Sequence, residues 1–219
     1  MYVVFEGPDG SGKTTLVNSV YNKLKFITEH PIVTTMQPGS TQLGKHIRQL
    51  VKYPDSFSTD SPMVIDDLSR QMLYMVDCVN NIKTIVVPAL ENNCIVLSDR
   101  TSYISSIVYS LVENDSNIDS ILRLQKILKP PTIDLLFVLN ISAENSRKRM
   151  NHRKDTLGDH YDSKSSHFHD KTNTIYSNIN DYLNVIECDI ADVIHIDAMI
   201  TLEQMTNTVV SAIISKFSI

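Results

Sequence analysis

Residues 2–15, YVVFEGPDGSGKTT, hold the most informative pattern in this chain of 219 residues. Residues 2–6 form a short apolar run that predicts a buried strand, and apolar residues at helical spacing follow from Lys13. Between them, GPDGSGKT at positions 7–14 satisfies the pattern GxxxxGK[ST] throughout. A strand, a glycine-rich loop and a helix in this order are typical of a phosphate-binding loop.

The loop predicts a nucleoside triphosphate site. Its glycines allow successive backbone N–H groups to point inward, and the start of the helix adds the positive end of its dipole. We expect Lys13 to bridge the β- and γ-phosphates and the Thr14 hydroxyl to ligate Mg²⁺. A chance glycine turn before a helix is the alternative, and the matching flanks disfavour it. The predicted ATP-binding residues are Gly7, Pro8, Asp9, Gly10, Ser11, Gly12, Lys13, Thr14 and Thr15.

Strand and helix patterns alternate along the rest of the chain. Apolar runs predict strands at 2–6, 32–35, 94–97, 133–139 and 192–196. Helical spacing predicts helices at 13–25, 41–51, 64–91, 102–112, 118–128, 143–154, 168–186 and 202–213, and 52–62 predicts a loop. Such alternation predicts an α/β fold of the P-loop NTPase type, in which a five-stranded parallel sheet lies between two layers of helices. We find no linker, so 1–219 is predicted to be one domain.

Composition excludes several classes of protein. The chain carries 20 basic and 25 acidic residues, which disfavours a surface built to bind nucleic acid. No apolar run approaches the ~20 residues of a membrane span, and the first residues carry no leader pattern. We therefore expect a cytoplasmic protein that binds neither membrane nor nucleic acid. The three cysteines are far apart, which makes a disulfide framework or a zinc cluster a poor interpretation.

Asp99 and Arg100 end the third predicted strand, at the edge where open α/β sheets bind ligands. The Asp99 carboxylate is placed to hold the hydration shell of Mg²⁺, and the Arg100 guanidinium suits a second phosphate. The alternatives are an aspartate that caps the next helix and an arginine in a surface salt bridge. A Pro-Gly turn at 38–39 leads into the helix that carries Arg48. Such a turn is a common connector and by itself does not indicate a function.

A second concentration of charge lies in the segment 147–154, which holds five of the 20 basic residues. Arg149 and Arg153 are four residues apart and therefore share a helix face. Arginines that close over transferring phosphates stabilise the charge that develops there. A solvated helix face is the alternative, and the lack of interleaved aromatic residues disfavours a nucleic-acid patch. His167 and His169 have no third metal ligand near them in sequence.

Taken together, these segments resemble thymidylate kinases, in particular the bacterial type. The resemblance begins with FEGPDGSGKTT at 5–15 and continues through PGST at 38–41 to Arg48. It then follows PAL at 88–90, DR at 99–100 and LNISAE at 139–144. It extends through Arg149, Arg153, Asp159 and FHDK at 168–171 to Tyr176, and so covers most of the chain in order.

The resemblance implies a nucleoside monophosphate kinase that transfers the γ-phosphate of ATP to dTMP with Mg²⁺, acting as a homodimer. Asp9 would approach the sugar 3′-hydroxyl of the acceptor nucleotide, and Tyr74 would stack on its base. The implied catalytic residues are Lys13, Asp9, Arg100, Arg149 and Arg153, the last two in a mobile lid at about 147–163. The implied metal ligands are Thr14 and Asp99. The implied acceptor-binding residues are Asp9, Pro38, Arg48, Tyr74, Cys78, Arg100, Ser105 and Ser106.

The chain departs from the family pattern in its acceptor pocket. The family's Arg-Glu-Pro-Gly turn reads Met36-Gln37-Pro38-Gly39 here, and Cys78 replaces an arginine that reads the base. The lid's Asp-Arg pair reads Asp159-His160. We therefore expect dUMP or another pyrimidine deoxynucleotide to be accepted beside dTMP. A deoxynucleoside kinase and a non-catalytic nucleotide-binding protein remain as alternatives. Arg48 argues against the first, because a nucleoside has no phosphate to bind.

Overall fold

A five-stranded parallel sheet forms the centre of the computed structural model, which describes residues 1–57, 61, 63–113, 118–152, 160–161, 164–186 and 188–217. Its strands are β1 (Tyr2–Glu6), β2 (Ile32–Met36), β3 (Ile95–Asp99), β4 (Ile133–Asn140) and β5 (Ile190–Asp197). They lie in the order β2-β3-β1-β4-β5, and every neighbouring pair is parallel. The predicted α/β fold is confirmed.

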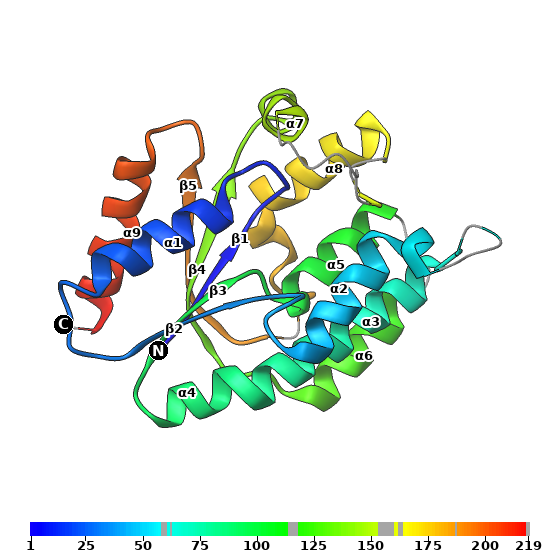
Figure 1. Cartoon of the computed structure of the whole chain (residues 1–219). Helices are drawn as coiled ribbons and strands as arrows, with labels where there is room; N and C mark the ends of the chain where they lie inside the picture. The colour runs from blue at the N-terminus through cyan, green and yellow to red at the C-terminus, as the bar shows by residue number, and fades with distance from the viewer. Residues whose placement is uncertain are drawn as a thin grey trace.

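Helices cover both faces of the sheet (Figure 1). The side chains of β1 alternate, so that Val3 and Phe5 join a core with α1 and α9, whereas Tyr2 and Val4 join the core on the opposite face. That opposite core includes residues of α3, α5 and α8. The helices are α1 (Lys13–Leu24), α2 (Gln42–Lys52), α3 (Asp67–Asn81), α4 (Val87–Glu91), α5 (Ser102–Glu113), α6 (Ile118–Leu128), α7 (Ala143–Asn151), α8 (Ser166–Ser177) and α9 (Leu202–Phe217).

The segment predicted as one helix at 64–91 is helical from Asp67, whose N-cap Asp66 accepts a hydrogen bond from Ser69 N. A π-helical turn, Ile82–Val86, joins α3 to α4 just before Pro88. Proline has no N–H and crowds the preceding turn, which a wider turn relieves. The whole stretch Asp67–Glu91 is long and apolar enough to span a membrane by length and composition. Its inward side chains, among them Met75, pack in the core, as in the core helix of a soluble protein.

The prediction of one long helix at 168–186 is wrong. Helix α8 ends at Ser177, and a short 3₁₀ helix, Ile179–Tyr182, follows Asn178. The Asn178 side chain donates to Thr174 O at 2.9 Å. Asparagine competes in this way with the regular backbone bonds of a helix, which explains the break. A 3₁₀ helix, Pro54–Phe57, also occupies part of the predicted loop 52–62.

The strand order places the phosphate loop at the middle of the sheet. β1 lies between β3 and β4, so the chain leaves β1 where the connections diverge to the two sides. Open parallel sheets bind ligands in this crevice, beyond the carboxyl ends of the strands. The residues after β1, β2 and β3 therefore converge there although they are distant in sequence.

Candidate active site

The loop at 7–14 folds around the ammonium group of Lys13. Lys13 Nζ donates to Gly7 O and to Pro8 O, both at 2.9 Å. Gly10 has φ +78°, and a Cβ there would lie 2.7 Å from Ser146 O, so no other residue fits this position without a shift. Burial and the nearby Arg100 charge lower the pKa of Lys13 to about 8. Phosphate oxygens beside the ammonium would favour its charged form again.

Thr14 and Asp99 lie where the sequence predicts metal ligands. The Thr14 hydroxyl donates to Asp99 Oδ2 at 2.5 Å, and both residues line the cavity beside Lys13. A hydroxyl and a carboxylate oxygen at the mouth of a phosphate site are suitable ligands for Mg²⁺ or its water shell. The two oxygen ligands, one from a hydroxyl and one from a carboxylate, therefore fit Mg²⁺.

Arg100 is held between two carboxylates. Its Nη1 donates to Glu6 Oε2 at 3.1 Å, and its Nη2 donates to Asp9 Oδ1 at 2.8 Å. Glu6 is fully buried and also accepts hydrogen bonds from Thr101 N, Ser105 Oγ and the Tyr176 hydroxyl. Burial alone would raise the pKa of Asp9, but the charges of Arg100 and Lys13 hold it well below its usual range. Asp9 therefore stays ionised at neutral pH.

The structure brings most predicted acceptor residues to one cavity, which we call the acceptor cavity. Asp9, Pro38, Arg48, Tyr74, Arg100 and Ser105 line it, together with Gln37, Lys52, Ser102, Tyr109 and Tyr161. A second cavity, the phosphate cavity, is lined by Gly12, Lys13, Thr14, Thr15, Met36 and Asp99. Asp9, Gln37, Arg48, Lys52 and Arg100 line both cavities. These shared residues mark the junction between the two.

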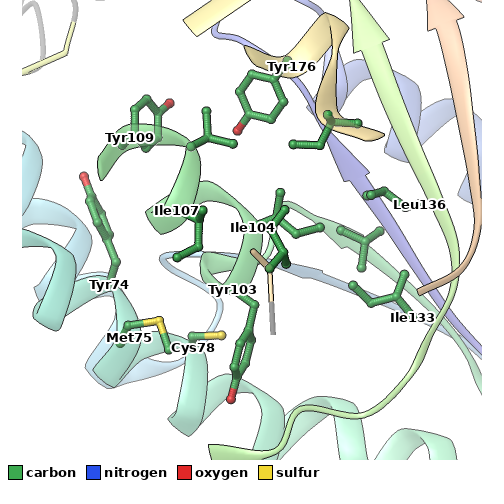
Figure 2. Packing of buried hydrophobic residues seen from close by; sticks show 14 of the residues in the cluster. Tyr74, Met75, Cys78, Tyr103, Ile104, Ile107, Tyr109, Ile133, Leu136 and Tyr176 are labelled. Carbon is green, nitrogen blue, oxygen red and sulfur yellow. The ribbon is translucent and has the colours of Figure 1, made fainter. Parts of the chain in front are cut away.

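Cys78 and Ser106, by contrast, line neither cavity. Cys78 is 0% exposed, and its Sγ lies 3.8 Å from Thr101 Oγ1. It belongs to the core cluster that also contains Met75 and Tyr103 (Figure 2). Burial raises the pKa of its thiol to about 12. Ser106 is 1% exposed. Tyr74, one helical turn before Cys78 on α3, lines the acceptor cavity, whereas Cys78 packs in the core.

Aromatic rings form a wall of the acceptor cavity. Tyr161 stacks on Tyr109 with ring centroids 4.5 Å apart, and its centroid lies 6.4 Å from that of Tyr74. Sequence reasoning missed Tyr109 and Tyr161, because single tyrosines on a core helix and in a polar segment give no local signal. It also missed Glu6, although an acidic residue at the end of a buried strand, directly before the loop, is an available signal.

Arg149 reaches the outer side of the phosphate loop from α7. Its Nη1 donates to Gly10 O at 3.4 Å, and its Nη2 donates to Ala198 O at 2.8 Å. A third cavity lies here, lined by Arg149 and by the apolar side chains Ile200, Leu202 and Met205. These C-terminal residues were not predicted. Helix α7 ends at Asn151, three residues short of its prediction, and Arg153, Asp159 and most of the predicted lid lie outside the described residues.

The chain is similar in sequence to proteins of a known family. A model of the thymidylate kinase family matches residues 5–199. The chain belongs to the thymidylate kinase family. A thymidylate kinase of Caldicellulosiruptor saccharolyticus is 33% identical over 174 residues, which cover 78% of each chain. A thymidylate kinase of Mycoplasma capricolum is 28% identical over 217 residues, which cover 99% of this chain and 95% of that one. One of Prochlorococcus marinus is 34% identical over 177 residues, 78% of this chain and 79% of that one.

Membership of the thymidylate kinase family makes this chain an ATP-dependent nucleoside monophosphate kinase. The two cavities that meet at Asp9 and Arg100 agree with a reaction between two nucleotides. No covalent intermediate is needed in such a transfer, because positioning and neutralisation of charge supply most of the rate enhancement.

Proposed function

We propose that this protein phosphorylates dTMP at the junction of the two cavities. The observation that carries the proposal is the set of residues common to both cavities, of which Arg48, Lys52 and Arg100 are cations. A junction of this kind suits two anionic substrates whose phosphates must approach one another. The test is a coupled assay of ADP release with dTMP, thymidine and the four ribonucleoside monophosphates. Transfer to dTMP supports the proposal, and transfer to thymidine alone contradicts it.

The residues at and around the junction divide the tasks of the transfer between them in this proposal. The N–H groups of the loop and the Lys13 ammonium bind the β- and γ-phosphates of ATP, with Thr14 and Asp99 as ligands of Mg²⁺. Mg²⁺, when bound, neutralises charge on the phosphates. Arg48 and Arg100 orient the phosphate of dTMP, and Asp9 approaches the sugar hydroxyl. Arg149, with Arg153, offsets charge on the transferring group.

We further propose that the acceptor base is read loosely. The residues that line the acceptor cavity alone are Pro38, Tyr74, Ser102, Ser105, Tyr109 and Tyr161, and none of these carries a charge at neutral pH. Hydrogen bonds from such neutral hydroxyl groups are about half as strong as the charge-assisted bonds that an arginine would donate, so they discriminate less between bases. dUMP, which lacks one methyl group, should therefore be phosphorylated, with kcat/KM within roughly 200-fold of that for dTMP. A ratio above ~10⁴ would contradict weak discrimination of the base.

The deoxynucleoside kinase alternative is disfavoured by the same junction. Arg48 Nη1 donates to Pro38 O at 3.0 Å, which holds its guanidinium against the acceptor cavity. A neutral nucleoside would leave this cation without a substrate anion. The non-catalytic alternative is disfavoured by the intact set of Lys13, Thr14, Asp99 and Arg100.

We propose that the enzyme is a single domain over residues 1–219, works in the cytoplasm and forms a homodimer. Met72 and Val76 lie one turn apart on α3 and are 44% and 48% exposed, so they offer an apolar strip for a second copy. Sedimentation of the wild type and of a Met72→Glu, Val76→Glu variant tests the dimer. A dimer that the double variant converts to a monomer supports this interface.

A further inference from the structure

Two buried side-chain amides connect the elements that surround the acceptor cavity. Ser102 N, at the start of α5, donates to Gln37 Oε1 at 3.0 Å. Gln37 Nε2 donates to Oδ1 of Asn81, the last residue of α3, at 3.2 Å. Asn81 Nδ2 donates in turn to Thr35 Oγ1 of β2 at 2.7 Å. We call this series of three hydrogen bonds the amide bridge. Gln37 is 1% exposed and Asn81 is 0% exposed.

The amide bridge has a fixed direction, which its first donor sets. A backbone N–H can only donate, so Gln37 must turn its oxygen to Ser102 and its NH₂ group to Asn81. Asn81 must then turn its own NH₂ group to Thr35, whose hydroxyl oxygen accepts. The turn of the family has glutamate at position 37, and an ionised carboxylate has no hydrogen to donate. The bridge in this direction therefore depends on the glutamine of this chain.

The bridge joins two helices that line the acceptor cavity. Ser105 lines it from α5, and Tyr74 lines it from α3. Glu6 accepts from Thr101 N at 2.9 Å and so holds the start of α5 to β1, but that bond does not fix α5 against α3. Apolar packing between helices has no preferred angle, whereas a hydrogen bond requires a definite length and direction. The amide bridge, which begins at Gln37, supplies this directional link.

We propose that Gln37 is a positioning residue for the acceptor nucleotide. Through the amide bridge it holds the start of α5 against the end of α3, and so sets the opening between Ser105 and Tyr74 in which the base binds. This inference rests on the proposed function, because it assumes that the acceptor occupies this cavity. Arg48 and Arg100 hold the phosphate separately, so loss of the bridge weakens acceptor binding more than it slows transfer.

The experiment compares Gln37→Met with Gln125→Met, which also removes a buried amide bonded to α5. Gln125 is 0% exposed and its Nε2 donates to Tyr103 O at 2.8 Å, but it lines neither cavity of the site. We expect Gln37→Met to raise KM for dTMP about tenfold or more, with KM for ATP within twofold and kcat within fivefold of the wild type. Asn81→Leu, which breaks the bridge at its next residue, should give the same pattern. Gln125→Met should lower the melting temperature and change none of these constants.

Two further measurements separate positioning from stability. Asn81→Asp is the conservative variant, because its carboxylate can accept from both Gln37 Nε2 and the Thr35 hydroxyl, and KM for dTMP should stay within about threefold of the wild type. Crystal structures of the free wild type and of free Gln37→Met measure the opening without substrate. We expect the distance between the Cα atoms of Tyr74 and Ser105 to change by about 0.5 Å or more, the tolerance of a well-positioned site.

Other outcomes overturn the proposal. An unchanged KM for dTMP in folded Gln37→Met, or an unchanged distance between Tyr74 and Ser105, would show that the bridge does not set the opening. Equal changes in the two glutamine variants would assign Gln37 a structural role only. Melting curves show whether Gln37→Met folds, and Asn81→Leu replaces it in every comparison if it does not. A wild type that does not phosphorylate dTMP would contradict the proposed function, and the crystal structures would still decide whether Gln37 sets the opening.

Discussion

Arg100 and Asp9 form the central ion pair of the site, with Arg100 Nη2 2.8 Å from Asp9 Oδ1. The pair joins a residue that follows β3 to one in the loop after β1, and φ of +73° at Arg100 turns its side chain toward that loop. A non-glycine residue in this conformation carries strain that its surroundings must offset. Here the buried carboxylate of Glu6 accepts from the other end of the guanidinium.

Glu6→Gln should lower both stability and activity. An amide keeps the shape of the side chain but removes the charge that faces Arg100, so a buried guanidinium loses part of its compensation. Breaking a buried pair costs on the order of 3 kcal/mol, which urea unfolding would reveal. Glu203→Gln, on the exposed side of α9, is the matched control. An unfolding free energy equal to that of the wild type would show that Glu6 does not support Arg100.

Lys13→Ala should abolish phosphoryl transfer and leave the fold intact. The Lys13 ammonium donates only within the loop, so its loss removes few tertiary contacts. It does remove the charge expected at the β- and γ-phosphates. The measurement is kcat beside a melting curve, with Lys25→Ala at the end of α1 as the control. More than a tenth of the wild-type kcat in a folded variant would refute the assignment.

Arg149→Ala should lower kcat more than it raises KM for either substrate. The guanidinium contacts the backbone of the loop at Gly10, where it can act on charge that develops during transfer. Interactions of that kind are worth about 10²-fold in kcat. Lys148→Ala is the control, because that lysine pairs with Glu144 on the surface. An unchanged kcat for Arg149→Ala would support the alternative interpretation, in which the basic segment is a solvated helix face. We predict the same split for Arg153→Ala.

Asp77→Asn should stabilise the protein at alkaline pH. Asp77 is 0% exposed, and burial raises the pKa of its carboxyl to about 6, against 3.8 in an exposed chain. The wild type therefore loses stability from this group as pH rises from about 4 to about 6. The complete loss is roughly 3 kcal/mol. At pH 4 the carboxyl is protonated in the folded state and about half protonated in the unfolded state, so most of the difference should be lost. Unfolding free energies at pH 4 and pH 8, with Asp119→Asn as the exposed control, test this. An equal effect at both pH values would contradict it.

Cys78→Ser should leave base selectivity unchanged. Because the side chain packs in the core below the acceptor cavity, a hydroxyl there costs about 1–3 kcal/mol of stability but meets no substrate. The measurement is the ratio of kcat/KM for dTMP to that for dCMP, whose base has a different hydrogen-bonding edge, beside urea unfolding. A change of more than tenfold in this ratio would show that residue 78 affects recognition of the base.

The sequence alone was sufficient for the parallel sheet and for the loop at its centre. Both follow from short-range features, since apolar runs, helical spacing and the order of glycines around Lys13 are all readable along the chain. The position of Asp99 and Arg100 at the same edge followed from a general rule, because parallel strands end on one side of a sheet.

Other features needed the packed fold. Four residues separate Tyr74 from Cys78, and the pattern placed them together, but the orientation of α3 over the sheet exposes one to the acceptor cavity and buries the other. Likewise, no local signal joins Glu6 to Arg100 and Tyr176, which are 94 and 170 residues away. Spacing fixes which side chains share a helix face. Only the packing of helices against the sheet, driven by burial of their apolar faces, fixes what each face meets.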